Sequence, residues 1–210
     1  MVKNLRKTLL LILLCTLATI SSAIFGDLFP TDKLCFSKEN LNKGYFWTPI
    51  TALFLHVNIA HLIGNMLFLY VFGSTLEKEV GFSRTATSFF LGGALSFILS
   101  SYFYEDNTIM IGASAAIFTL VAIVMLVKPL KFSWLFLMPL GLVAILYFIY
   151  NIFAVYYPQL GEPGVSYLGH IIGFLVGVPF GIAWSRGRWK RNLLITITLL
   201  VIYYLIISVF

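Results

Sequence analysis

Charged side chains are scarce in this sequence: they make up 10% of its 210 residues, against about 25% in an average soluble protein. Hydrophobic residues make up 60%, and the mean hydropathy is +0.96. These values exclude an ordinary water-soluble domain and predict an integral membrane protein in a lipid bilayer. The net charge of +6 is then a topology signal, and we expect no nucleic-acid partner.

Cysteine is also rare, and several catalytic motifs are missing. Cys15 lies in an apolar run and Cys35 in a polar loop, so we expect no disulfide between them. None of the three histidines begins an HExxH motif, which excludes the common zinc-protease site. The apolar stretches contain no aspartate pair, and the chain has no glycine-rich phosphate loop or dinucleotide fingerprint. We therefore expect no metal site and no cofactor.

Apolar stretches long enough to cross a bilayer, about 17–25 residues each, occur seven times. They cover residues 8–25, 57–76, 84–104, 110–127, 132–156, 165–184 and 192–210. We predict an all-α polytopic membrane protein, with a six-helix core over residues 1–191 and an additional C-terminal transmembrane helix over 192–210. The first stretch could instead be a signal peptide, but it is long for one, and we favour a retained helix.

The basic residues are divided unevenly between the loops. Alternate loops, counted from the N-terminus, hold eleven of the 14 Lys and Arg residues, and the opposite loops hold Lys33, Lys38 and Lys43. Cytoplasmic loops carry the excess of basic residues. The sequence therefore predicts a multi-pass protein of the cell membrane with its N-terminus in the cytoplasm and its C-terminus outside. The eleven residues are Lys3, Arg6, Lys7, Lys78, Arg84, Lys128, Lys131, Arg186, Arg188, Lys190 and Arg191.

Four polar side chains lie at a similar predicted depth in the outer leaflet. Ser114 lies near the start of the span 110–127, and His170 lies about five residues into 165–184. His61 and Asn65 lie in the outer half of 57–76. At 1.5 Å per residue, all four are roughly 6–10 Å below the outer surface. Polar groups are costly inside a membrane, so their convergence at one depth favours a functional site.

The span 165–184 carries a stripe of small and polar residues. Its members are four, three, four and four residues apart, so they share one helix face. They are Ser166, His170, Gly173, Gly177 and Gly181. Glycine lets a neighbouring backbone approach closely. If that neighbour is the helix of Gly112 and Ser114, the serine hydroxyl can reach the imidazole.

This set of residues suits nucleophilic catalysis. A serine needs a base that accepts its proton, and His170 is the candidate that fits. His61, the Asn65 amide and the backbone N–H of Ser114 can donate to an oxyanion, aided by the positive helix N-terminus. None of the eight acidic residues lies deep in a predicted span, so the sequence predicts a Ser–His dyad without a third member. We give His56, which precedes His61 by five residues, a minor role.

Three motifs together resemble the rhomboid family of intramembrane serine proteases. They are "HVNIAHLIGN", "GASA" and "GHIIGFLVG", and the resemblance covers residues 47–181. It implies that Ser114 is the nucleophile and His170 the general base, with His61 and Asn65 at the oxyanion. It also implies that Phe118, one turn below Ser114, packs against the imidazole.

Other segments fit the same resemblance. "YFWTPITALFLH" is similar to the family's amphipathic first loop, and "PQLGEPGVSY" is similar to the mobile cap over the site. The span 132–156 resembles the lateral gate, in which we expect Trp134, Phe136 and Phe148 to face lipid or the core. We expect Gly112 and Gly173 to support the site.

Two positions depart from the family pattern. Ala115 follows the nucleophile, where glycine is common, and its methyl group lies beside the oxyanion site. Thr48 follows Trp47, where arginine is common, and we expect the missing arginine to loosen the loop.

The resemblance and the residues together predict a serine endopeptidase that cleaves transmembrane protein substrates, single-pass or other, near the outer membrane face. The implied substrate has a helix that unwinds locally, because a hydrogen-bonded helix shields its carbonyls, and a small residue before the cut. One alternative is a catalytically inactive relative that binds transmembrane helices. A less favoured alternative is a proton-coupled transporter that uses His170 and His61 as a relay.

Overall fold

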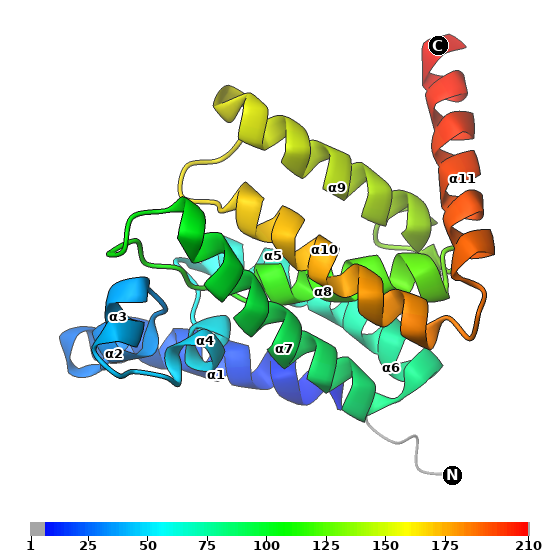
Figure 1. Ribbon diagram of the computed structural model, residues 1–210. Coiled ribbons are helices and arrows are strands. Elements are labelled where there is room, and N and C mark those ends of the chain that lie inside the picture. The colour runs from blue at the N-terminus through cyan, green and yellow to red at the C-terminus, as the bar shows by residue number, and fades with distance from the viewer. Residues whose placement is uncertain (1–6, 210) are drawn as a thin grey trace.

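The computed structural model describes residues 7–209, which form a bundle of helices (Figure 1). Lys3 and Arg6, which enter the orientation prediction, lie outside the described residues, as does the last residue of the predicted span 192–210. The long helices are α1 (Thr8–Phe25), α7 (Phe82–Ser100), α8 (Ser114–Val127), α9 (Leu140–Tyr156), α10 (Tyr167–Trp184) and α11 (Trp189–Val209). A further continuous helix consists of α5 (Ile59–Phe68), the π-helical segment η3 (Leu69–Gly73) and α6 (Ser74–Val80).

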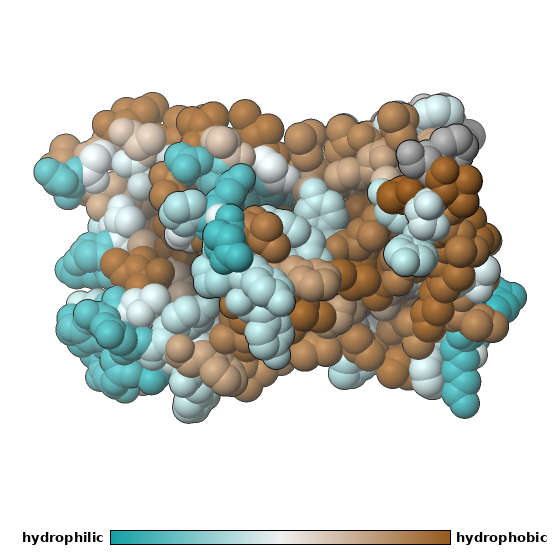
Figure 2. All heavy atoms as spheres, turned by 90° about the horizontal axis from the view of Figure 1, so that it is seen from above, coloured by the Kyte–Doolittle hydropathy of each residue, from teal (hydrophilic) through white to brown (hydrophobic). Residues whose placement is uncertain are grey.

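Five of these helical segments are long and apolar enough to cross a membrane, and α8 and α9 are shorter apolar helices. Apolar side chains also cover most of the flank between the two ends of the bundle, whereas hydrophilic ones gather mainly at the end that carries the short helices α2 and α3 (Figure 2). The predicted all-α, multi-pass membrane fold is therefore confirmed. Cys15 and Cys35 form no disulfide with each other, as predicted, and both are buried.

The segment between α1 and α5 folds into short helical turns at one end of the bundle. They are η1 (Gly26–Leu28), α2 (Thr31–Leu34), α3 (Lys38–Asn42), α4 (Thr48–Thr51) and η2 (Ala52–Phe54). Thr48 is fully buried and donates through Oγ1 to the Tyr45 carbonyl at 2.8 Å. Trp47 donates through Nε1 to the Lys33 carbonyl. That the missing arginine loosens this loop stays a prediction.

The predicted helix over 132–156 starts later than expected. Its first residues form a two-stranded hairpin of β1 (Phe132–Ser133) and β2 (Met138–Pro139), in which Phe132 pairs with Pro139. Helix α9 begins at Leu140, directly after Pro139 in extended conformation. Proline lacks the N–H that a helix interior requires, so it stands at the boundary. The apolar run misled the prediction because hydropathy alone does not separate a short strand from a helix.

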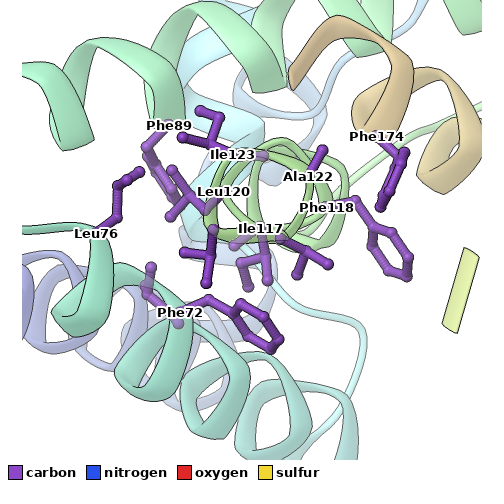
Figure 3. Packing of buried hydrophobic residues seen from close by; sticks show 14 of the residues in the cluster. Phe72, Leu76, Phe89, Ile117, Phe118, Leu120, Ala122, Ile123 and Phe174 are labelled. Carbon is purple, nitrogen blue, oxygen red and sulfur yellow. The ribbon is translucent and has the colours of Figure 1, made fainter. Parts of the chain in front are cut away.

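Helix α8 forms the centre of the bundle. Every one of its residues after Ser114 is buried, and the close-up shows apolar side chains from the surrounding helices on several sides of it (Figure 3). A helix that is hydrophobic on all faces requires neighbours on all faces. The nucleophile candidate therefore begins the most enclosed helix of the protein.

Helix α10 packs on α8 through the predicted glycine stripe. A Cβ atom at Gly173 would overlap the backbone of Ala115, and one at Gly177 would overlap the backbone of Thr119. In addition, the Thr119 hydroxyl donates to the Gly173 carbonyl at 2.9 Å. The two backbones are thus in direct contact, which confirms that the stripe faces the serine helix.

The first and last helices attach by polar contacts at their ends. The Glu77 carboxylate of α6 accepts from the N–H and the hydroxyl of Thr8 at 2.8 and 2.6 Å, and so caps α1. Helix α11 is drawn almost upright in Figure 1, at a steep angle to α9 and α10. Asn192, at its start, donates to the Leu126 carbonyl at the end of α8 at 2.7 Å.

Candidate active site

Ser114 is the first residue of α8 and follows a loop that contains Gly112. Gly112 has φ +115°, a conformation that suits glycine, and a Cβ there would lie 2.9 Å from His61 Cε1. The Gly112 N–H donates to the Ala52 carbonyl at 2.9 Å. Glycine is therefore required at 112 for two reasons, backbone conformation and contact with a site histidine.

His56 holds the same loop, which corrects its predicted minor role. It is buried, and its Nε2 accepts from the Ala113 N–H at 3.4 Å. Its Nδ1 lies 3.1 Å from Thr19 Oγ1, which in turn donates to the Phe54 carbonyl at 3.2 Å. Burial, and secondarily the nearby His61, lowers the pKa of His56 to about 4. A neutral ring with its proton on Nδ1 satisfies both contacts.

The sequence pattern missed His56 because helical spacing does not describe a residue that precedes the helix. His56 lies between η2 and α5, and its ring meets that of His61 edge-on with centroids 5.2 Å apart. The available signal was that His56 is the first residue of the motif "HVNIAHLIGN". Its contact with Ala113 depends on how the loop folds back onto α8.

His170 lies in the first turns of α10, stacked on a ring from α8. Its imidazole lies 4.5 Å from the Phe118 ring, centroid to centroid, with 7° between the planes. Ser166 caps α10 by accepting from the Gly169 N–H at 3.1 Å. Ser166, His170 and Phe118 are thus brought together by the contact of α8 with α10.

A further residue, Asn151 of α9, contacts the imidazole. Asn151 Oδ1 lies 2.8 Å from His170 Nδ1, and the asparagine side chain is buried. The sequence search for a third member considered only carboxylates and so passed over this amide. An asparagine within an apolar span was the signal that could have found it, because such a group is costly there unless bonded.

His61 and Asn65 lie on α5, which begins at the cap Asn58. Asn58 Oδ1 accepts from the His61 N–H at 2.8 Å. Asn65 is buried, and its Nδ2 donates to the His61 carbonyl at 2.8 Å. An amide NH₂ has two hydrogens, so a second donor is left on Asn65.

Two cavities meet at these residues. One of about 290 Å³ lies between the end of α7, the loop before α8 and the start of α10. The other, of about 800 Å³, lies between α5 and α9. Both are lined by Ser114, His61 and His170, and the larger one also by Asn65 and Asn151. No hydrogen bond joins Ser114 to His170 within residues 7–209, although both side chains border the same spaces. Such bonds often tighten only when a substrate is bound.

The smaller cavity contains polar groups suited to water. Ser100 is buried and, among the described residues, its hydroxyl has no partner, although it lines this cavity. Tyr104, from the segment after η4 (Ser101–Phe103), places its hydroxyl 3.1 Å from Ser166 Oγ. Together with His61 and Ser166, which line the same cavity, Ser100 and Tyr104 give it four polar side chains that could bond water.

The aromatic residues of the predicted gate divide into two groups. Trp134 is 83% exposed, so it faces the surroundings. Phe136 lies 4.9 Å from the Phe68 ring of α5, and Phe148 stacks on Phe174 of α10 at 4.3 Å. Both outcomes, an outward-facing position and core packing, were among those expected.

The fold and site define a class: a multi-pass helical membrane protein with a serine and a histidine that line the same two cavities. The sequence pattern of the Rhomboid domain matches residues 43–187. The chain therefore belongs to the rhomboid family, which includes intramembrane serine proteases.

Curated relatives come from plants and a parasite. The chain is 30% identical to RHOMBOID-like protein 7 of Arabidopsis thaliana over 72% of this chain and 48% of that protein. It is 33% identical to RHOMBOID-like protein 6, mitochondrial, of the same plant, over 64% and 42%. It is 23% identical to Rhomboid-like protease 1 of Toxoplasma gondii over 70% and 50%. The chain thus spans about half the length of these relatives.

Proposed function

We propose that this chain is a serine endopeptidase that hydrolyses peptide bonds of transmembrane protein substrates inside the membrane. The observation that carries the proposal is the convergence of Ser114, His170, His61 and Asn65 on one cavity between α5 and α9. A nucleophile, a base and two donors are the parts that acyl transfer needs.

In the proposed reaction, Ser114 Oγ attacks the substrate carbonyl while His170 Nε2 accepts the hydroxyl proton. The protonated imidazole then gives that proton to the departing amine, which leaves an acyl group on Ser114. A water molecule attacks this ester while His170 takes a proton from the water, and the imidazole then returns that proton to Ser114 Oγ as the carboxylic acid product leaves. Ser100 and Tyr104 at the smaller cavity support the access of water to this step.

The tetrahedral intermediates carry a negative charge that requires donors. Ser114 stands at the N-terminus of α8, where the helix dipole is positive. Its own N–H, the His61 ring and the second hydrogen of the Asn65 amide are the proposed donors. Ala115, the residue after the proposed nucleophile, lines the smaller cavity. We propose that its methyl group narrows the space beside the oxyanion.

The proposed substrate enters between α5 and α9, because the larger cavity lies between these helices. Its walls include apolar groups such as Val57, Ile117 and Phe118, which suit a transmembrane segment. The family resemblance suggests a small residue before the cleaved bond. The division of basic residues suggests cleavage near the outer face of the cell membrane.

Labelling by a fluorophosphonate tests the nucleophile. We expect the purified protein in detergent to label at Ser114, and both Ser114→Ala and His170→Ala to abolish labelling without unfolding the protein. Ser185→Ala is the matched control, because its hydroxyl bonds the Ile182 carbonyl at the far end of α10. Labelling that persists in Ser114→Ala contradicts the assignment. A folded wild-type protein that never labels supports the inactive helix-binding alternative.

Cysteine accessibility tests the orientation. Cysteine introduced at Asp106 or Glu162 is expected to react with an impermeant maleimide added to intact cells, whereas cysteine near Lys78 or Arg188 is not. The native Cys35 gives little background, since burial and the nearby Asp32 raise its pKa to about 11. The reverse pattern would place cleavage at the cytoplasmic face.

A further inference from the structure

The amide of Asn151 has a defined orientation. Its Nδ2 donates to the Tyr147 carbonyl, one turn earlier on α9, at 2.7 Å. A carbonyl can only accept, so the NH₂ group must face Tyr147. The amide oxygen is thereby turned toward α10, where it lies 2.8 Å from His170 Nδ1. The backbone of α9 thus determines which end of Asn151 meets the imidazole.

This orientation determines the tautomer of His170. Because Asn151 Oδ1 can only accept, the nitrogen opposite it must carry the hydrogen. In a neutral imidazole the hydrogen on Nδ1 leaves an unprotonated Nε2. That second nitrogen is the one available to take a proton from Ser114. Phe118 fixes the plane of the ring by stacking, but a stacked ring can still flip by half a turn about its Cβ–Cγ bond, which keeps the plane and exchanges the positions of Nδ1 and Cδ2. The bond to Asn151 removes this rotation.

We propose that Asn151 is a positioning residue that holds His170 with Nδ1 protonated and Nε2 free for Ser114. The inference rests on the proposed function and replaces the two-member site with a serine–histidine–asparagine array. When the imidazole becomes charged, the amide oxygen faces its Nδ1–H and stabilises it by a charge-assisted hydrogen bond. In the proposed reaction His170 exchanges protons with Ser114, the leaving amine and the attacking water, and Asn151 takes no proton.

The position of Asn151 also links the base to the substrate cavity. Asn151 and Tyr147 both line the larger cavity from α9, opposite residues of α5. A substrate that contacts α9 therefore contacts the helix that orients the base. The titratable groups that line the two cavities around His170 are His61 from α5, Tyr104 after η4, Tyr147 and Tyr150 from α9, Tyr167 from α10 and Glu162 from the loop before it.

Three variants test the proposal by the rate of fluorophosphonate labelling at different pH values. Asn151→Leu keeps the side-chain volume but removes the acceptor, and we expect labelling to slow by about 10- to 100-fold. Asn151→Asp restores an acceptor, so we expect most of the rate to return. Its carboxylate favours the imidazolium, so the acid limb of the rate should move to higher pH. Asn192→Leu, at the other end of the bundle, removes a buried structural amide and should leave the shape of the pH profile unchanged.

Nitrogen-15 NMR of histidine-labelled protein gives a readout that does not need activity. The protonated and unprotonated ring nitrogens differ in chemical shift, and His170→Gln identifies the resonances. We expect Nδ1 to be the protonated nitrogen in the wild type and a mixture of tautomers in Asn151→Leu. If the wild type does not label but its tautomer still depends on Asn151, the positioning role holds and the protease proposal fails. An unchanged labelling rate and tautomer in folded Asn151→Leu would overturn the inference.

Discussion

The two flanks of His170 are built differently. On one flank, α8 and α10 touch backbone to backbone, because glycine at 173 and 177 leaves no side chain between them. On the other flank, α9 faces α5 across a cavity of about 800 Å³. There the contact is made by aromatic rings, such as Phe68 against Tyr147 with centroids 4.8 Å apart.

This difference separates two requirements of the proposed reaction. The nucleophile and base must keep a fixed distance, and backbone contact through glycine cannot be adjusted without separating the helices. A substrate must enter from the side, and ring contacts across a cavity can be broken and remade at small cost. We call the α8–α10 contact the fixed flank and the α5–α9 contact the adjustable flank. Asn151 joins the two, because it lies on α9 of the adjustable flank and bonds His170 on α10 of the fixed flank.

Breaking the fixed flank should have the largest effect. Gly173→Ala places a methyl group within the Ala115 backbone, so we expect a loss of at least about 3 kcal/mol of stability and no labelling of Ser114. Gly64→Ala, in α5, is the control, because a Cβ there meets nothing within 4 Å. It should raise stability by up to about 1 kcal/mol. Thermal unfolding in detergent measures both, and a stable, labelling Gly173→Ala protein would show that the helix contact is not rigid.

The two proposed oxyanion donors lie on α5, where the α5–α9 cavity meets the residues of α8 and α10. His61→Ala and Asn65→Ala should each lower kcat by about 10²–10³, or roughly 2.7–4 kcal/mol, with a much smaller change in KM. The double variant should fall short of additivity, because both donors share one acceptor. A quenched fluorescent transmembrane peptide provides the kinetics. Activity losses that follow the melting temperature instead would assign both residues to packing.

The loop that carries the nucleophile on the fixed flank depends on neutral His56. Because burial lowers the pKa of folded His56 to about 4, protons bind better to the unfolded chain, whose histidine titrates near 6.5. The stabilisation of the folded state by neutral His56 is complete above about pH 6.5. About 3 kcal/mol of it is lost as the pH falls from 6.5 to 4. His56→Gln keeps an acceptor for Ala113 without titrating, so its melting temperature should vary less with pH. Parallel curves for the two proteins would refute this role.

Loosening the adjustable flank should have the smallest effect. Phe68→Leu removes ring contacts with Tyr147 and Phe136, worth about 1 kcal/mol. We expect cleavage of the transmembrane peptide to accelerate by up to about fivefold, with fluorophosphonate labelling unchanged. Phe90→Leu is the matched control, because the Phe90 ring of α7 also meets two aromatic rings, those of Phe54 and Phe89, and neither belongs to α5 or α9. Equal acceleration in both variants would mean that general loosening, not the α5–α9 contact, limits entry.

Much of the fold could be predicted from the sequence because membrane helices leave simple signals. Long apolar runs marked each of the seven helical segments, and the spacing of Gly173 and Gly177 correctly identified the face that meets α8. Errors arose at the ends of helices, as at Pro139, where local backbone chemistry outweighs hydropathy. The predicted stacking of Phe118 on His170 was confirmed.

The sequence by itself predicted which groups share one depth, because helix rise and loop order set the expected depth of each residue. It therefore nominated Ser114, His170, His61 and Asn65 before any contact was known. Only the tertiary structure decided how those groups are held, because a hydrogen bond depends on the rotation and approach of helices far apart in the chain. His56 reaches Ala113 across 57 residues, and Asn151 meets His170 from a neighbouring helix. No periodicity within one segment encodes such a contact, because it depends on how segments far apart in the chain pack against one another.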